Sequence, residues 1–222
     1  MARSSFDLRS WLLRGVIALV AASFVGFGIM TWLDGQNRTA RVEELVQEAS
    51  DLREFESDLT GARARLEEAL DLDRNAWAAH FEMGRLLRAL SRDGDAAAAF
   101  ETAVELAPED ERAPIWLYLG RANQDQLKAT GKKRFYTNAR MAFDEAQSGP
   151  DVAAQALCSL ALLEIEARKL PNGERYLRRA LEAFERLGRD YPEFDEIDVA
   201  DYSKKLQTMI ERAMLDKEKK SS

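Results

Sequence analysis

From residue 43 onward, apolar residues return every three or four positions, which is the spacing of one buried face of a helix. Short polar or glycine-containing stretches interrupt the pattern and predict helices that come in pairs joined by turns. The stretch 78–87, AAHFEMGRLL, has this spacing and places Gly84 at its centre. Because glycine in a helix interior costs about 1 kcal/mol relative to alanine, Gly84 indicates a position where a larger residue would not fit.

Small and large apolar residues recur at fixed distances from Trp77. With Trp77 as position 1, the residues at positions 7, 8, 20, 24, 27 and 32 are Met83, Gly84, Ala96, Phe100, Ala103 and Pro108. This pattern resembles the tetratricopeptide repeat, a helix–turn–helix unit of 34 residues. The resemblance implies that the small residue at position 8 lets the first helix of the unit pack closely on the second.

The pattern returns in units that begin at Ala113 and Ala154, and in a degenerate form before Trp77. In the unit from Ala113, the residues that match positions 20, 24 and 27 are displaced by seven residues. Seven residues are about two helical turns, so we expect two longer helices that meet near Gly131. A generic helical bundle would share the apolar period, but it would not repeat the small residues at the same positions.

An apolar segment of another kind precedes the repeats. Residues 15–33 contain no charged residue, and a helix of about twenty apolar residues crosses the hydrocarbon core of a bilayer. Trp11 and Trp32 lie near its ends, where indole rings favour the headgroup region. A cleaved signal peptide is the alternative, but the apolar run continues for eleven residues beyond Ala22, a conceivable cleavage site. We therefore predict an uncleaved anchor.

The charges around this segment predict its orientation. Arg3, Arg9 and Arg14 precede it, whereas acidic residues dilute the arginines that follow. Positive flanks stay in the cytoplasm, so we expect the repeats to lie across the membrane, which in a bacterium is the periplasm.

The sequence thus predicts an all-α solenoid of the tetratricopeptide type, preceded by a single transmembrane helix. The predicted segments are a cytoplasmic N-terminus (1–14), the transmembrane helix (15–33), a linker (34–42), a repeat domain (43–187), a connector with a capping helix (188–216) and a disordered tail (217–222). The repeat domain divides into a degenerate repeat (43–76) and the repeats 77–110, 113–153 and 154–187.

Composition excludes several functions. The net charge is −7 and the pI is about 5.0, with scattered basic residues, so the chain lacks the concentrated positive surface that nucleic acid requires. His80 and Cys158 are the only residues of their kinds, so neither a zinc site nor a catalytic triad can be assembled. We expect His80 and Cys158 to be structural, and the protein to be neither an enzyme nor a holder of a cofactor or metal. An enzyme that uses carboxylates and arginines alone is the remote alternative.

Two charged stretches have simpler interpretations. The acidic stretch 190–201 predicts a solvated connector, since it lacks both the spacing and the turn glycine of an EF-hand loop. The basic cluster 132–134 is interpreted as a solvated loop, with contact to an acidic partner or a lipid headgroup as the alternative.

The resemblance also implies a partner-binding groove, because positions 2, 5, 9 and 12 of each first helix line the concave surface in this family. The residues predicted to line this groove are Phe81, Arg85, Arg88, Leu117, Arg121, Gln124, Cys158, Leu162 and Ile165. An apolar strip flanked by arginines suits a peptide or helix that carries apolar anchors and an acid. The alternative is that the arginines are solvated or paired within the domain.

Chaperone-tail binding is not expected, because Phe81 and Arg85 stand where family members that bind such tails carry Lys and Asn. The leading hypothesis is a membrane-anchored scaffold for protein–protein interaction, which assembles or stabilises a membrane-associated complex. Its partners would be proteins, membrane proteins among them, together with the bilayer through residues 15–33. One alternative is a chaperone-like accessory of protein export, because the layout is similar to that of the ancillary subunit of the bacterial Sec translocon. Another is an organelle receptor with its repeats in the cytosol.

Overall fold

The computed structural model describes residues 35–169 and 173–221, and all of the regular elements among them are helical. A leading helix spans residues 35–51 and continues as a π-helical turn, η1 (Leu52–Glu56). The later elements are α2 (Leu59–Leu72), α3 (Trp77–Ala89), α4 (Asp93–Leu106), η2 (Glu109–Glu111), α5 (Arg112–Thr130), α6 (Lys133–Ala146), α7 (Ala153–Ala167), α8 (Gly173–Asp190) and α9 (Val199–Ser221). This part of the chain confirms the predicted all-α class.

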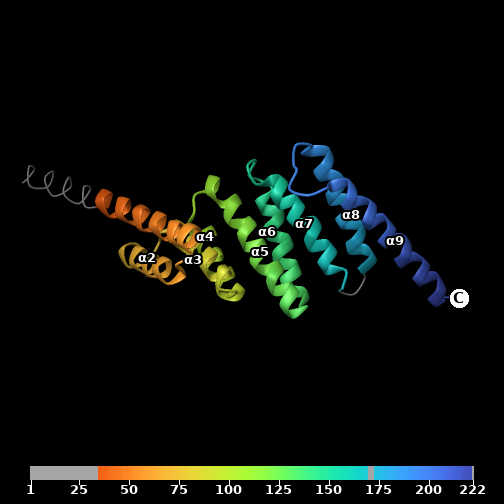
Figure 1. The fold of residues 1–222 in the computed structure, drawn as a ribbon, viewed down its shortest axis with the longest axis horizontal. Helices are drawn as coiled ribbons and strands as arrows, with labels where there is room; N and C mark the ends of the chain where they lie inside the picture. The colour runs from red at the N-terminus through yellow and green to blue at the C-terminus, as the bar shows by residue number, and fades with distance from the viewer. Residues whose placement is uncertain (1–34, 170–172, 222) are drawn as a thin grey trace, which may run out of the picture.

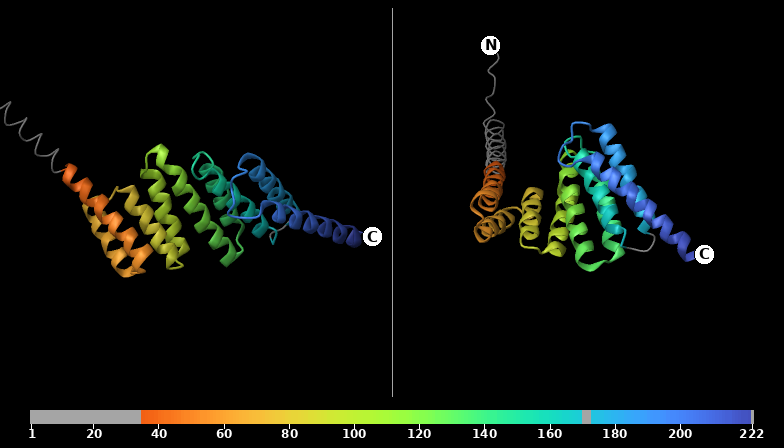
Figure 2. Two further views of the ribbon diagram at one scale, coloured as in Figure 1. Left: turned by 45° about the horizontal axis from the view of Figure 1, so that its top comes forward. Right: turned by 45° about the vertical axis from the view of Figure 1, so that its right-hand side comes forward.

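Antiparallel helix pairs follow one another along the long axis of the molecule (Figure 1). The leading helix and α2 form one end of the row, and α9 forms the other (Figure 2). Each helix packs on the next, and α5 also contacts both α3 and α7. The first helices of successive pairs therefore form one layer, as expected for a helix–turn–helix solenoid, and the core runs through it as successive apolar clusters.

The glycines at position 8 lie where a neighbouring ring leaves no room for a side chain. A Cβ atom on Gly84 would lie 2.5 Å from Cε1 of Phe100, the residue at position 24 of the same unit. Gly120 has the same relation to Phe143 in the next unit, and both phenylalanines are fully buried. Close packing of paired helices outweighs the poor helix propensity of glycine, which confirms the reason predicted for Gly84.

The extra residues of the third helix pair lie in its first helix. The helix α5 has 19 residues against 13 in α3, whereas α6 has 14 residues, as α4 does. Only one of the two helices predicted to be longer is longer. The pair turns at Gly131, whose φ of 64° is left-handed and ends α5. A residue of that conformation is a frequent helix terminator, and glycine adopts it at little cost.

Both ends of the described chain are more helical than expected. The segment 34–42, predicted as a linker, is helical from residue 35 and runs without a break into the leading helix. The tail 217–222, predicted as disordered, is helical through Ser221, because α9 continues to that residue. Leu206 and Ile210 of α9 are buried against the last apolar cluster, so α9 covers the end of the core.

The predicted membrane span, residues 15–33, lies outside the described residues. Within residues 35–169 and 173–221, no helix combines the length and the apolar character that crossing a bilayer requires.

Candidate functional site

A cleft of about 440 Å³ opens between η1, α3 and α5, on the layer formed by the first helices of the units. Its lining comprises Arg53, Arg85, Arg88, Ala89, Ser91, Asp93, Tyr118 and Asp125. Arg85 and Arg88 are three residues apart and therefore share one face of α3. Three guanidinium groups, two carboxylates and a phenol give the cleft a strongly polar surface.

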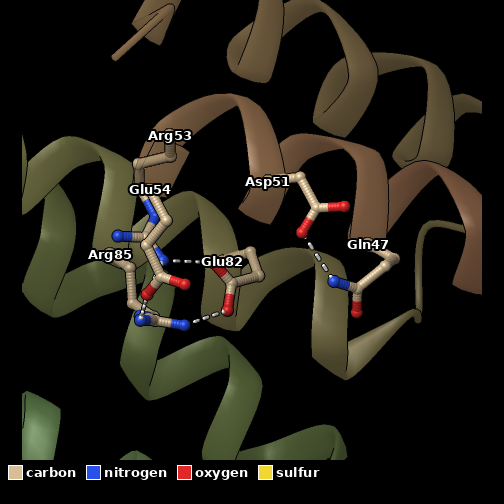
Figure 3. A network of polar contacts seen from close by, with 6 residues as sticks. All are labelled: Gln47, Asp51, Arg53, Glu54, Glu82 and Arg85. Atoms are coloured by element: carbon tan, nitrogen blue, oxygen red, sulfur yellow. Dashed lines mark hydrogen bonds and ion pairs between the residues drawn. The ribbon is translucent and has the colours of Figure 1, made fainter. Parts of the chain in front are cut away.

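Two arginines and two glutamates close a ring at one side of the cleft (Figure 3). Arg85 on α3 pairs with Glu82 at 2.6 Å and reaches Glu54 of η1 at 2.9 Å. Arg53 on η1 pairs with its neighbour Glu54 at 3.2 Å and with Glu82 at 3.4 Å. This arginine–glutamate ring, made of Arg53, Glu54, Glu82 and Arg85, joins the first repeat unit to the second.

Three of the four side chains in the arginine–glutamate ring are largely shielded from water, whereas Glu54 is 48% exposed. The side chains of Glu82, Arg53 and Arg85 are 9%, 14% and 19% exposed. The hydrogen bond and charge of Arg53, and then the charge of Arg85, lower the pKa of Glu54 below its usual value. Burial alone would lower the pKa of Arg85. The nearby carboxylates of Glu82 and Glu54 outweigh burial, so the pKa of Arg85 is raised. Arg85 is therefore committed to contacts inside the protein.

Tyr118 of α5 brings two of the predicted arginines together. The guanidinium carbons of Arg85 and Arg121 lie 5.4 Å and 5.6 Å from the centre of its ring, within the range of cation–π attraction. Phe81 packs edge-on against the same ring at 5.3 Å. Among the described residues, no carboxylate lies within ion-pair distance of Arg121. Its charge is thus available at a surface that also offers aromatic rings.

A contact between α3 and α5 also lines the cleft. Nε and Nη2 of Arg88 both donate to Oδ2 of Asp125, at 3.1 Å and 3.0 Å. Lys128 adds a second cation to Asp125 at 3.1 Å. Burial and the negative charge of Asp125 raise the pKa of Asp93, which starts α4 at the rim of the cleft. Arg88, like Arg85, is held by an internal carboxylate.

The predicted groove residues fall into three sets. Phe81, Arg85, Arg88 and Arg121 lie at or beside the cleft, as the repeat register implies. Leu162 and Ile165 of α7 are half-buried against the last apolar cluster.

The other three, Leu117, Gln124 and Cys158, are only 1%, 9% and 6% exposed. All three belong to the interior rather than to an open groove: Leu117 and Gln124 because α5 packs directly on both α3 and α7, and Cys158 because it is part of the last apolar cluster.

The sequence interpretation missed Arg53, Glu82 and Asp125 as parts of the cleft. Glu82 is three residues before Arg85, a spacing that favours a pair on one helix face and could have indicated it. Arg53 lies 29 residues before Glu82, and Asp125 lies 37 residues after Arg88. No local signal marks these two contacts, since they depend on how the units stack.

A second polar cluster joins the third unit to the fourth. The hydroxyl of Tyr136 on α6 donates to both carboxylate oxygens of Glu164 on α7, at 2.9 Å and 3.1 Å. Arg179 of α8 donates to the Tyr136 oxygen at 3.1 Å, and Nε of Arg140 lies 3.7 Å from Glu164. Glu164 is 2% exposed, and burial raises its pKa. Burial and Glu164 raise the pKa of Tyr136 to about 12.

Metal or nucleophilic chemistry has no visible site in this part of the chain. Within residues 35–169 and 173–221, no group of three His, Cys, Asp or Glu side chains is arranged to hold a metal ion. His80 lies against the turn before α3, where its Nε2 is 2.9 Å from the carbonyl oxygen of Arg74. Cys158 is buried, and burial with the charge of Glu196 raises the pKa of its thiol to about 11. A thiol in that state is a poor nucleophile.

Comparison with known proteins bears on the fold. Neither a family model nor a curated protein matches the chain. The solved structure described as "MamA RS-1 ArsTM double mutant" is 16% identical, with a TM-score of 0.50 over 78% of this chain and 96% of that one. "Crystal structure of MamA" is 18% identical, with a TM-score of 0.48 over 78% and 96% of the two chains. "Crystal structure of YrrB: a TPR protein with an unusual peptide-binding site" is 18% identical, with a TM-score of 0.49 over 81% and 97%.

At identities this low the similarity concerns the fold alone. The first of these structures, together with the repeated helix pairs and the packed glycines at position 8, gives the chain a solenoid fold of the tetratricopeptide type.

Proposed function

We propose that this chain is a protein-interaction scaffold, anchored in a membrane by residues 15–33, whose concave surface binds an acidic segment of a partner protein. The observation that carries the proposal is Arg121, a guanidinium beside Tyr118 that has no ion-pair partner among the described carboxylates. A carboxylate of a partner would gain a charge-assisted hydrogen bond there, worth about 1.5–3 kcal/mol. The neighbouring cleft of about 440 Å³ offers room for adjoining side chains.

The geometry favours binding over catalysis. Arg85 and Arg88 are neutralised within the protein, and the single histidine and cysteine occupy structural positions. A solenoid presents an extended surface built from successive helices, which suits contact with a segment of another chain. We therefore propose a scaffold that is not an enzyme.

The anchor is the second part of the proposal. The uncharged run 15–33 supports a span, and the arginines before it support a cytoplasmic N-terminus. In a bacterium the solenoid would then face the periplasm from the inner membrane. An anchor raises the effective concentration of the concave surface toward a membrane-bound partner, which suits a role in assembling or stabilising a membrane complex.

Membrane association is tested by extraction. We expect the full chain to stay with the membrane fraction after washing with alkaline carbonate, and a variant that lacks residues 1–34 to be released. An intact mass that includes residues 1–22 distinguishes an uncleaved anchor from a processed signal peptide. Release of the full chain by carbonate would contradict the membrane anchor, and it would have no bearing on the proposed groove.

The groove is tested by Arg121→Glu, which reverses the available charge and leaves the arginine–glutamate ring intact. Partners that co-purify with the full chain in mild detergent would be identified, and the Arg121→Glu variant is expected to lose them while its thermal midpoint stays within a few degrees. The matched control is Arg63→Glu, since Arg63 is an exposed arginine on α2. Equal loss in both variants, or retention in both, would contradict a binding role for Arg121.

A further inference from the structure

The connector between α8 and α9, residues 191–198, is not simply solvated as its composition predicts. Its apolar residues Tyr191, Phe194 and Ile197 are half-buried and pack against the last apolar cluster. The acidic residues between and after them are exposed. The connector therefore binds the fold through spaced apolar anchors and turns its carboxylates to solvent, in a segment without helix or strand.

The surface that the connector covers is the part of α7 predicted to line the groove. Nε2 of Gln155 donates to Oε1 of Glu196 at 2.8 Å, and Cys158 is 6% exposed. Gln155 and Cys158 occupy positions 2 and 5 of the last unit, which the repeat register predicts to face the groove. The connector thus contacts the first turn of α7, within the layer of first helices on which a partner segment would bind.

Charge at this surface matches the connector. Burial raises the pKa of the Cys158 thiol, Glu196 raises it further and Arg121 lowers it, so both opposite charges act on the same residue. Arg121 projects from α5, the helix before α7 in this layer. The acidic connector therefore contacts α7, the helix that packs against α5, and α5 carries the one groove arginine, among those in the described chain, that has no internal carboxylate.

The contact between the connector and the last apolar cluster is shallow. The three anchors are half-buried rather than enclosed, and Gln155–Glu196 is an exposed hydrogen bond. Segments with few buried contacts open at a lower free energy than the core around them. The helices α8 and α9 also contact each other directly, and Leu206 and Ile210 of α9 are buried in the same cluster as α8, so the packing of α9 on α8 does not depend on the connector alone.

We infer that the α7 end of the concave surface is a binding site for acidic segments with spaced aromatic and aliphatic anchors, and that the chain's own connector fills it. A partner segment of the same chemistry binds by displacing residues 191–198. This inference deepens the proposed function and rests on it, since it names the class of partner that the concave surface accepts.

The single cysteine makes displacement measurable in the full chain. Phe194→Ser with Ile197→Ser removes two anchors, and we expect alkylation of Cys158 at pH 8 to become at least about tenfold faster, because opening exposes the thiol. The matched control is Leu72→Ser with Leu90→Ser, two partly exposed leucines at the other end of the solenoid. An unchanged rate, or an equal increase in both double variants, would overturn the inference.

A peptide of residues 190–201 tests the ligand chemistry directly. We expect the labelled peptide to bind the Phe194→Ser, Ile197→Ser variant and to slow the alkylation of Cys158, while a peptide of the same composition in scrambled order does neither. Binding of both peptides alike, or of neither, would overturn the inference even if the thiol becomes accessible. These outcomes are independent of the co-purification test on Arg121→Glu, so failure here is distinguishable from failure of the proposed function.

Discussion

Glu82 on α3 and Glu164 on α7 are both buried, and the chain holds these two carboxylates in different ways. Glu82 lies between two guanidinium groups, with Arg85 at 2.6 Å and Arg53 at 3.4 Å. Glu164 receives two short contacts from a neutral phenol, and its nearest cation lies 3.7 Å away. Each glutamate stands at a junction between repeat units, the first unit with the second and the third with the fourth.

The difference shows what decides the charge state of a carboxylate inside a protein. Desolvation raises the pKa of a buried acid unless close cations or hydrogen-bond donors stabilise the ionised form. At Glu164 the donors only partly offset burial, so its pKa stays raised. The first junction is thus a cluster of paired charges, whereas the second depends on a phenol that keeps its proton, since the pKa of Tyr136 is about 12.

The largest effect is expected from the apolar packing on which both junctions rest. Gly84→Leu and Gly120→Leu each place a side chain where Phe100 or Phe143 already lies, so we expect each to lower the free energy of unfolding by about 3 kcal/mol, since overpacking forces the paired helices apart. Urea unfolding followed by circular dichroism measures both losses. A gain in stability at either site would contradict the repeat register, and clearly unequal losses would break the equivalence of the two helix pairs.

The charged junction is probed by Glu82→Ala. Removal of Glu82 leaves Arg85 with Glu54 alone and Arg53 without its partner on α3, so we expect a loss of about 2 kcal/mol. This is below the cost at a fully buried pair, because both arginines retain some exposure and water screens them. The control is Glu54→Ala, where the lost side chain is about half exposed and the effect on unfolding should be smaller. A larger loss of stability in Glu54→Ala than in Glu82→Ala would mean that Glu54, rather than Glu82, contributes most to the charged junction.

Much of the fold could be predicted because its signals are local. The spacing of Gly84, Ala96 and Phe100 within one unit reports a packing contact inside that unit, and the structure contains it. The length of α6 could not be predicted, because seven extra residues before Ala139 can extend either helix of the pair. The residues around Gly131 favour the end of a helix there, but they indicate only where the two helices meet and not which of the two is longer.

The site was predictable only in part, because most of it is made between units. The register predicts that Arg85 and Arg121 face the same side, and both lie within 6 Å of the Tyr118 ring. The repeat register does not indicate which other segment of the chain buries a given side chain. Cys158 belongs to an apolar cluster against which the connector also packs, and Glu196 of that connector bonds to Gln155 from 41 residues away. The anchor at 15–33 stays a prediction from sequence.

The second junction is tested by Tyr136→Phe, which removes the hydroxyl that donates to Glu164 and keeps the aromatic ring. Glu164 then loses both of its short hydrogen bonds inside the core, so we expect a loss of about 1–1.5 kcal/mol in the free energy of unfolding at pH 7. The ring of Tyr136 also packs edge-on against Tyr176 at 5.0 Å, a contact that phenylalanine retains. Tyr176→Phe is the matched control. Equal losses in the two variants would assign the effect to packing rather than to the carboxylate.

The smallest effect expected is a dependence on pH that belongs to Glu164. Its pKa in the folded protein lies above the ordinary value, which for a glutamate in an unfolded chain is about 4.3. As the pH rises above that value, the unfolded chain loses its proton first, so the free energy of unfolding falls until the folded pKa is passed and then stays level.

The Glu164→Gln variant keeps the shape and an acceptor for the Tyr136 hydroxyl but cannot ionise. We therefore expect the free energy of unfolding of Glu164→Gln, minus that of the natural protein, to grow as the pH rises from about 4 and then to level off. Urea titrations at a series of pH values measure this difference. A difference that is independent of pH would contradict the raised pKa of Glu164, on which the contrast between the two junctions depends.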